Sequence, residues 1–410
     1  MRTFADPEPL VWERTAGTWI WDADGRRYLD LYAGFAAATV GYCHPRVTKA
    51  IVEQAQLMTH CPSAAPAAVR AELYERLVAL APAGLDRVLL AVTGAAANEL
   101  AVQLARAATG REQVISFSGT YLGRSVGSVG LAGKRAYREQ LRVPAGGQFL
   151  PYPDPYRSRW AGIADPGELV LGLLEQMLGD PASGLDRPAC IVFEPIQGNG
   201  GVVIPPPGFL AGLRRLADEH GALLLFDEIQ CGLGRSGLMW ACQHEDVVPD
   251  LMTVGKGVGG GLALAAVLGT TEVMTTWEPD AFTSTFLANA LNAAAGVAAL
   301  DIVVEERLVD RSARLGAHAL ARLQAGLAGA DHVGDVRGRG LFIGIELVTD
   351  RDTRAPNPER CAAAMRALRD RGVIVGRGGR NGSVIKVSPA LVIEEDDLDA
   401  GLATVVEVLA

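Results

Sequence analysis

An acid and a lysine each follow an apolar segment in the middle of the sequence. The run from Leu223 to Phe226 ends at Asp227, and the run from Leu251 to Val254 is followed two residues later by Lys256. Such runs predict buried parallel strands, and open α/β folds place their ligands at the carboxyl ends of these strands. Asp227 and Lys256 are 29 positions apart (256 − 227), about the length of one strand-helix-strand unit. We therefore expect both side chains at neighbouring strand ends in one cleft.

A buried carboxylate and a lysine in one cleft suit the chemistry of pyridoxal phosphate. The lysine forms a Schiff base with this cofactor, and the carboxylate keeps the pyridine nitrogen protonated so that the ring accepts electrons. Each half alone has plainer interpretations, since an Asp-Glu pair after a strand also occurs as a metal ligand or a solvated strand end. A lysine among glycines is commonly a loop residue, and the segment around Lys256 lacks the spacing of a phosphate-binding P-loop. No metal site is predicted.

A second candidate ligand site lies where the apolar run from Val88 to Val92 meets Thr93-Gly94-Ala95 and a helical segment. A strand, a tight turn and a helix leave free N–H groups at the helix start, and those of Gly94 and Ala95 can hold a phosphate. The same letters begin like the nucleotide loop of a short-chain dehydrogenase. The further glycines of that fingerprint are missing, and no Tyr-x-x-x-Lys occurs at any of the eight tyrosines. A dehydrogenase is therefore disfavoured.

Length and composition indicate a globular protein with a large domain and one or two smaller ones. The chain has 410 residues, of which 49% are hydrophobic and 21% charged. A formal charge of −9 without a Lys/Arg block argues against nucleic acid as a partner. Six scattered cysteines without a C-x-x-C pair indicate reduced thiols in a cytoplasmic protein. No signal core and no run of about 18 apolar residues occurs, so no membrane insertion is expected.

Several motifs, in order along the chain, resemble those of the class III (omega-type) pyridoxal-phosphate-dependent aminotransferases, enzymes of fold type I. The resemblance extends from Gly17 to about Asp399 and is carried by the Asp227 and Lys256 pair, by Gly41-Tyr-Cys-His-Pro, and by Glu194-Pro-Ile-Gln-Gly-Asn-Gly-Gly. It implies an α/β fold with a large domain, whose mostly parallel seven-stranded sheet is covered by helices, and a small α+β domain built from both termini. The implied bounds are 1–45 and 296–410 for the small domain and 46–295 for the large cofactor-binding domain.

The resemblance also implies roles for individual residues around the cofactor. Tyr121 matches the aromatic residue that lies over the pyridine face, and Glu194 matches an acid of the hydrogen-bonded shell beside Asp227. Gln230 would hydrogen-bond the ring hydroxyl. Ser284 and Thr285 match a pair that reaches the cofactor phosphate of the neighbouring subunit, which implies a homodimer with shared active sites. At the phosphate turn Ala95 stands where the family usually has a serine, so one hydroxyl contact is lost while the backbone donors remain.

Substrate recognition is where the sequence departs from the family pattern. Lys386 stands where many members carry an arginine that grips an α-carboxylate, and Asn199 stands where some carry a glutamate that pairs with this arginine. Lysine is a point charge and not a bidentate fork, so we expect weaker α-carboxylate recognition and no sharp switch between substrates with and without this group. Arg124 and Lys386 are candidate anchors for a keto acid, and Phe35 lies at the expected entry to the cleft. Arg124 matches an arginine that binds a substrate carboxylate in some members and is a scaffold residue in others.

These departures favour an amine donor without an ordinary α-carboxylate, such as a terminal amine, an omega-amino acid or an amino sugar, with a keto acid, aldehyde or ketone as acceptor. The same cofactor site also supports decarboxylation coupled to transamination, as in the dialkylglycine decarboxylases, or amino-acid racemisation or epimerisation. A non-catalytic relative that serves as a binding subunit is disfavoured, because Asp227, Gln230 and Lys256 are all retained.

Overall fold

A seven-stranded sheet forms the centre of the computed structural model, which describes residues 10–158, 165–278, 280–287 and 289–410. The strand order is β4-β10-β9-β8-β7-β5-β6. All strands run parallel except β10, which is antiparallel to both of its neighbours. The predicted mostly parallel sheet is therefore confirmed. The strands are β4 (Arg87–Ala91), β5 (Gln113–Phe117), β6 (Gln148–Leu150), β7 (Pro188–Phe193), β8 (Leu223–Asp227), β9 (Leu251–Val254) and β10 (Ala265–Gly269).

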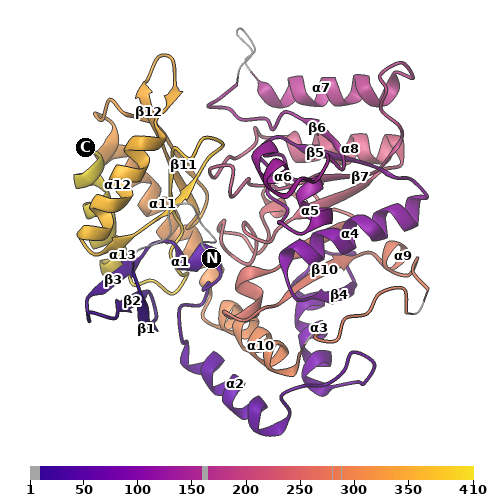
Figure 1. Ribbon diagram of the computed structural model, residues 1–410, viewed down its shortest axis with the longest axis horizontal. Coiled ribbons are helices and arrows are strands. Elements are labelled where there is room, and N and C mark those ends of the chain that lie inside the picture. Colours follow the sequence, from indigo (N-terminus) through magenta and orange to yellow (C-terminus); the bar gives the residue numbers. More distant parts are fainter. Residues whose placement is uncertain (1–9, 159–164, 279, 288) are drawn as a thin grey trace.

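Alternate residues of the central strands pack on opposite faces of this sheet. Leu224 and Phe226 belong to a core cluster that includes residues of α8 (Phe209–His220). Leu225 belongs to a second cluster that is built on α4 (Gly94–Thr109). Because helices cover both faces (Figure 1), the strands are apolar throughout and not alternating, which explains the continuous apolar runs in the sequence.

Strands from the N-terminal and C-terminal parts of the described chain lie side by side next to the large sheet (Figure 1). In one small sheet β3 (Arg27–Asp30) pairs in parallel with β14 (Val373–Ile374), and β1 (Trp12–Ala16) and β2 (Trp19–Asp22) complete it. This arrangement confirms the predicted α+β part built from both termini. A second small sheet contains β11 (Val333–Gly338), β12 (Ile343–Asp350), β13 (Ala355–Pro356), β15 (Gly376–Gly378) and β16 (Val384–Val387), with the helices α11 (Leu308–Leu327), α12 (Pro358–Asp370) and α13 (Glu395–Leu409).

The remaining helices surround the sheet. Helix α2 (Pro45–Leu57) begins after His44, whose Nδ1 accepts a hydrogen bond from the Arg46 backbone N–H. It packs with α10 (Ala290–Glu305) at the lower side of Figure 1. No helix of the described residues is long and apolar enough to cross a membrane. The other elements are α1 (Ala33–Ala36), α3 (Ala68–Leu80), α5 (Val126–Gly130), α6 (Arg135–Leu141), α7 (Pro166–Gly179), α9 (Thr271–Met274), α10 (Ala290–Glu305) and the 3-10 helices η1 (Ala241–Glu245) and η2 (Lys256–Gly259).

The connection between Asp227 and Lys256 differs from the predicted strand-helix-strand unit. After β8 the chain turns through a glycine-rich segment and η1 before it enters β9. Gly234 and Gly237 have φ angles of 80° and 88°, which favour turns over an α-helix. The strands β8 and β9 are nevertheless adjacent and parallel, so the prediction of neighbouring strand ends is correct although the connecting helix is wrong.

Candidate active site

The candidate site begins where β8 and β9 end side by side. Asp227 closes β8 and is paired with Thr253 of β9, and Lys256 follows three residues after this pair. Gly255 is extended and Lys256 has a φ angle of 49°, so the chain turns sharply at the lysine. The turn returns the chain into the antiparallel strand β10, because a parallel strand would need a longer crossover. Asp227 and Lys256 therefore lie together at the carboxyl ends of two central strands.

The Asp227 carboxylate is buried, with 5% of the residue exposed, and it is held by two donors. Its Oδ1 accepts from the Ile229 backbone N–H at 2.9 Å, and its Oδ2 accepts from Asn98 Nδ2 at 2.9 Å. Asn98 in turn accepts a hydrogen bond from the Thr253 hydroxyl at 2.8 Å. Burial raises the pKa of Asp227, while the Asn98 hydrogen bond, the Ile229 N–H and the Lys256 charge oppose this rise. The surrounding donors thus favour a charged carboxylate at this depth.

The neighbouring acid Glu228 points away from this cluster. Its carboxylate accepts hydrogen bonds from the backbone N–H groups of Ala241 and Cys242 at 2.9 and 2.7 Å, and from the Cys231 thiol at 3.2 Å. These contacts fix the start of η1. Only Asp227 of the Asp-Glu pair faces Lys256, because successive residues of an extended chain point to opposite sides.

Glu194 follows β7, next to β8, and ties two loops of the site together. Its Oε1 accepts from the Tyr121 N–H at 2.9 Å, and its Oε2 accepts from the Gly198 N–H at 3.0 Å. Burial and the nearby Asp227 charge raise the pKa of Glu194 to about 8, against the two backbone hydrogen bonds and the Lys256 charge. Burial and the Asp227 charge thus favour the protonated form of Glu194, while the Asn98 and Ile229 donors favour the charged form of Asp227.

Lys256 lies beside this cluster and is partly exposed. Burial lowers the pKa of its amine, and the carboxylates of Asp227 and Glu194 oppose this effect. A lowered pKa increases the fraction of neutral amine, which is the nucleophilic form. The site thus combines an activated lysine with a fixed carboxylate.

The backbone around these side chains packs closely and offers donors for a phosphorylated group. A Cβ on Gly198 would lie 2.1 Å from Gln230 Oε1, so the glycine is needed for Gln230 to occupy its position. At the start of α4 the Thr93 hydroxyl accepts from the Ala96 N–H at 3.2 Å. The preceding N–H groups, those of Gly94 and Ala95, have no hydrogen-bond partner among the described residues. Free donors at a helix start bind phosphate, so these residues fit pyridoxal phosphate.

A cluster around Tyr137 forms one rim of the site. The Tyr121 and Tyr137 rings meet edge to face at 5.8 Å, and the guanidinium of the exposed Arg124 lies 4.2 Å from the Tyr137 ring centroid. Asn199 donates from Nδ2 to the Tyr137 hydroxyl at 2.8 Å. The structure thus brings together three residues that the sequence singled out, and adds Tyr137. A tyrosine on a short polar helix gave no sequence signal for this role.

Lys386 and Phe35 lie on another side of the site. Lys386 is 1% exposed, and its Nζ is 5.1 Å from the centroid of the Tyr32 ring. Burial and the Lys256 charge lower the pKa of Lys386 to about 7, while the Glu194 charge opposes this shift. Phe35 is exposed and its ring packs against Tyr32 at 5.0 Å. Lys386 therefore faces the catalytic cluster, whereas Asn199 is engaged by Tyr137 and does not pair with it.

Ser284 and Thr285 lie in a loop before α10. Ser284 is partly buried and Thr285 is exposed. The adjacent Thr283 hydroxyl is 3.2 Å from that of Ser63, and Phe286 packs against His60. Neither the Ser284 nor the Thr285 hydroxyl hydrogen-bonds to another described residue. Among the described residues, no hydrogen bond connects Ser284 or Thr285 with the Lys256 cluster of the same chain.

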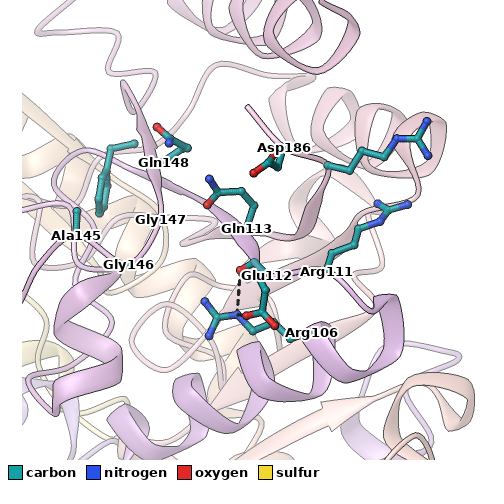
Figure 2. Close-up of a pocket in the computed structure, with 11 residues that line it drawn as sticks. Arg106, Arg111, Glu112, Gln113, Ala145, Gly146, Gly147, Gln148 and Asp186 are labelled. Carbon is teal, nitrogen blue, oxygen red and sulfur yellow. Dashed lines mark hydrogen bonds and ion pairs between the residues drawn. The ribbon is translucent and has the colours of Figure 1, made fainter. Parts of the chain in front are cut away.

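A surface cavity lies away from this site. Figure 2 shows this cavity of about 790 Å³, at the amino ends of β5 and β6, opposite the edge that carries Asp227. Arg111 on its wall donates to the carbonyl oxygens of Pro188, His220 and Gly221, so its charge serves the packing of loops. No group of three or more acids, cysteines or histidines in the described part of the chain is arranged to hold a metal ion.

Comparisons with known proteins agree with this geometry. The family model for class-III aminotransferases matches residues 3–409. The chain is 36% identical to the acetylornithine aminotransferase of Methanothermobacter thermautotrophicus, over 96% of this chain and 92% of that protein. It is 34% identical to the alanine/serine racemase of Pyrococcus horikoshii, over 96% and 84%. An amine transaminase from an uncultivated Pseudomonas species, solved with pyridoxal phosphate bound, superposes with a TM-score of 0.91 at 29% identity, over 100% of this chain and 98% of that one.

The chain therefore belongs to the class III aminotransferase family. It is a pyridoxal-phosphate-dependent enzyme. The fold type and the cofactor predicted from the sequence are both confirmed.

Proposed function

We propose that this enzyme moves an amino group between an amine donor and a keto acid, aldehyde or ketone, with Lys256 and Asp227 as its catalytic residues. The observation that carries the proposal is the arrangement of these two residues at the ends of adjacent parallel strands. There a buried carboxylate is fixed by two donors, and burial lowers the pKa of the lysine. Lys256 follows the end of β9, beside the buried Asp227 at the end of β8.

The residues present would divide the work as follows. Pyridoxal phosphate, when bound, supplies an aldehyde and an electron-withdrawing ring. Lys256 would hold that aldehyde covalently until an amine replaces it, and its free Nζ would then take up and return the proton of the reacting carbon. The Asp227 carboxylate would stabilise the protonated ring nitrogen. Gln230, Tyr121 and the N–H groups of Gly94 and Ala95 would orient the ring and its phosphate.

The substrate side of the proposal is an amine donor without an ordinary α-carboxylate, and a keto acid as acceptor. Asn199 is engaged by Tyr137, so it does not take the place of a glutamate that pairs with the residue at 386. Lys386 is a single buried point charge and offers one carboxylate contact where an arginine offers two. Arg124, exposed at the Tyr137 rim, is the second cation available to a keto acid.

A homodimer is part of the proposal, because Ser284 and Thr285 make no hydrogen bond to the described part of their own chain and would contact the partner's cofactor phosphate. Large apolar side chains that are exposed in one chain support it, among them Leu57, Val126 and Phe286. We also infer the division into a large domain of residues 46–295 and a small domain of residues 1–45 and 296–410. Six free cysteines fit the proposed cytoplasmic location.

A donor panel tests the reaction type. The enzyme loaded with pyridoxal phosphate is incubated with a keto acid and, in turn, a terminal amine, an omega-amino acid, an amino sugar and an α-amino acid. We expect consumption of the keto acid that depends on the amine, without release of carbon dioxide. Release of carbon dioxide would instead assign decarboxylation. Interconversion of the α-amino acid enantiomers without loss of keto acid would assign racemisation, the activity named for the Pyrococcus relative.

A further inference from the structure

The Lys386 ammonium lies over the face of one aromatic ring, that of Tyr32. Its Nζ is 5.1 Å from the ring centroid, within the range at which a cation is attracted to a π face. The Lys386 side chain forms no hydrogen bond or ion pair with another described residue. A buried charge without a hydrogen-bonded partner is costly, and the ring and the Glu194 charge partly compensate this ammonium.

The Tyr32 ring is held in this position by the backbone. A Cβ on Gly376 would lie 2.2 Å from Tyr32 Cε2, and Gly376 is the cross-strand partner of Lys386 itself. The Tyr32 N–H donates to Asp30 Oδ1 at 2.7 Å, and Phe35 packs against the ring. The ring therefore has little freedom to move away from the lysine.

The position of the Lys386 methylene chain also depends on a glycine of β15. A Cβ on Gly378 would lie 3.0 Å from Lys386 Cδ and 3.2 Å from Cε, which is tighter than ordinary contact. Two glycines of β15, two residues apart, thus admit the ring and the lysine stem side by side. The terminal ammonium remains the movable part of this arrangement, because the last bonds of a lysine side chain rotate freely.

We propose that Tyr32 is a specificity-determining residue, whose ring holds the Lys386 ammonium when the substrate carries no carboxylate and releases it to a substrate carboxylate that enters. This inference rests on the proposed function and gives a physical reason for the expectation that the cleft has no sharp switch between substrates with and without an α-carboxylate. The Tyr32 ring is an uncharged partner of Lys386, and it binds this cation more weakly than a paired glutamate would bind an arginine at this position. The cleft accordingly discriminates between the two substrate classes, but less sharply than an arginine with a glutamate would.

The proposal has a specific consequence for the pH dependence of carboxylate binding. Burial and the Lys256 charge lower the pKa of Lys386 to about 7, against the opposing Glu194 charge, so the ammonium is present below this pH and is lost above it. The ring stabilises only the charged form of free Lys386. Its removal should therefore strengthen carboxylate binding where Lys386 is charged, and leave it unchanged where Lys386 is neutral. A merely structural role of Tyr32 would alter binding at every pH.

The test uses propionate, a carboxylate without an amine, titrated into the enzyme loaded with pyridoxal phosphate and followed by the visible absorbance of the cofactor. Titrations extend about two pH units to either side of the Lys386 pKa of about 7. Tyr32→Leu and Tyr32→Met remove the ring with different shapes, so that one variant that fails to fold does not end the test. Tyr32→Phe is the matched control, because the Tyr32 hydroxyl has no hydrogen bond to a described residue.

We expect the affinity of the natural enzyme to rise as the pH falls through the Lys386 pKa and then to level off, with Tyr32→Phe on the same curve. The ring-free variants should match it at high pH and level off about threefold to thirtyfold tighter at low pH. A change of equal size at all pH values, or no change, would overturn the proposal, as would a pH dependence that persists in Lys386→Met. Propionate binding needs no turnover, so it is read separately from a failure of the proposed reaction, which the donor panel reports.

Discussion

Replacement of Asn98 by alanine should damage both the stability and the chemistry of the enzyme. The Asn98 side chain is buried and makes three hydrogen bonds. It donates to Asp227 Oδ2 and to the Leu122 carbonyl oxygen, both at 2.9 Å, and it accepts from the Thr253 hydroxyl at 2.8 Å. Asn98→Ala removes all three and leaves two acceptors and one donor without partners in the interior.

The expected magnitudes follow from these contacts. A neutral hydrogen bond contributes about 1 kcal/mol and one to a charged group about 1.5 to 3 kcal/mol, so the loss in unfolding free energy is about 4 kcal/mol. The Asn98 hydrogen bond lowers the pKa of Asp227, and its removal lets burial raise this pKa further. The loss of the charged contact, about 1.5 to 3 kcal/mol, corresponds to a chemical step about tenfold to a hundredfold slower. Because Asp227 ionises again at higher pH, the rate deficit should shrink as the pH rises.

Urea unfolding of the apoenzyme measures the first effect, and single-turnover kinetics with one amine donor across pH measure the second. Thr253→Val is the matched control. It leaves the Asn98 carbonyl oxygen without a donor, which costs about 1 to 3 kcal/mol of stability, but it retains the hydrogen bond from Asn98 to Asp227. If the single-turnover rate of Asn98→Ala had the same pH profile as that of Thr253→Val, Asn98 would support packing alone and would not lower the pKa of the Asp227 carboxylate.

Three further substitutions test other parts of the molecule. Asp227→Asn should still bind the cofactor but slow the chemical step at least a hundredfold, since stabilisation of developing charge contributes about 3 kcal/mol or more; near-normal single turnovers would contradict this. Glu346→Gln should cost about 3 to 5 kcal/mol in urea unfolding, because the charges of Arg157 and Arg337, at 2.7 and 2.8 Å from its oxygens, lose a buried partner; an unchanged midpoint would refute it. Arg124→Ala should slow the keto-acid half-reaction more than the amine half-reaction, and equal losses would place the carboxylate elsewhere.

The central strands, and the positions of Asp227 and Lys256 near their carboxyl ends, could be predicted from the sequence. Strands that are covered on both faces leave continuous apolar runs, so Leu223 to Phe226 stood out and Asp227 marked the strand end. β10 was not predicted as a strand, although its residues are apolar, because the short connection through η2 gave no indication of its direction. The helix expected between β8 and β9 was wrong, since the glycines of that segment have turn conformations.

The side chains that line the substrate region were harder to predict, because their contacts depend on distant parts of the chain. The turn at α1 places Ala33, Phe35 and Ala36 at φ angles of 48°, 64° and 63°, a left-handed conformation that non-glycine residues rarely adopt. Asp30 accepts the Tyr32 and Gly34 N–H groups in this turn, and no local pattern distinguishes such an aspartate from a solvated one. The contacts of Tyr32 with Lys386, and of Tyr137 with Asn199, join elements that are remote in the sequence.

The identity of the lysine that holds the cofactor can be measured directly. The enzyme loaded with pyridoxal phosphate is reduced with borohydride, digested, and its peptides are mapped by mass spectrometry. We predict that the pyridoxyl group is found on Lys256, and that Lys256→Ala carries none while it still unfolds cooperatively. A pyridoxyl group on any other lysine, or its absence from the reduced natural enzyme, would contradict the assignment of Lys256 and Asp227 as the catalytic pair.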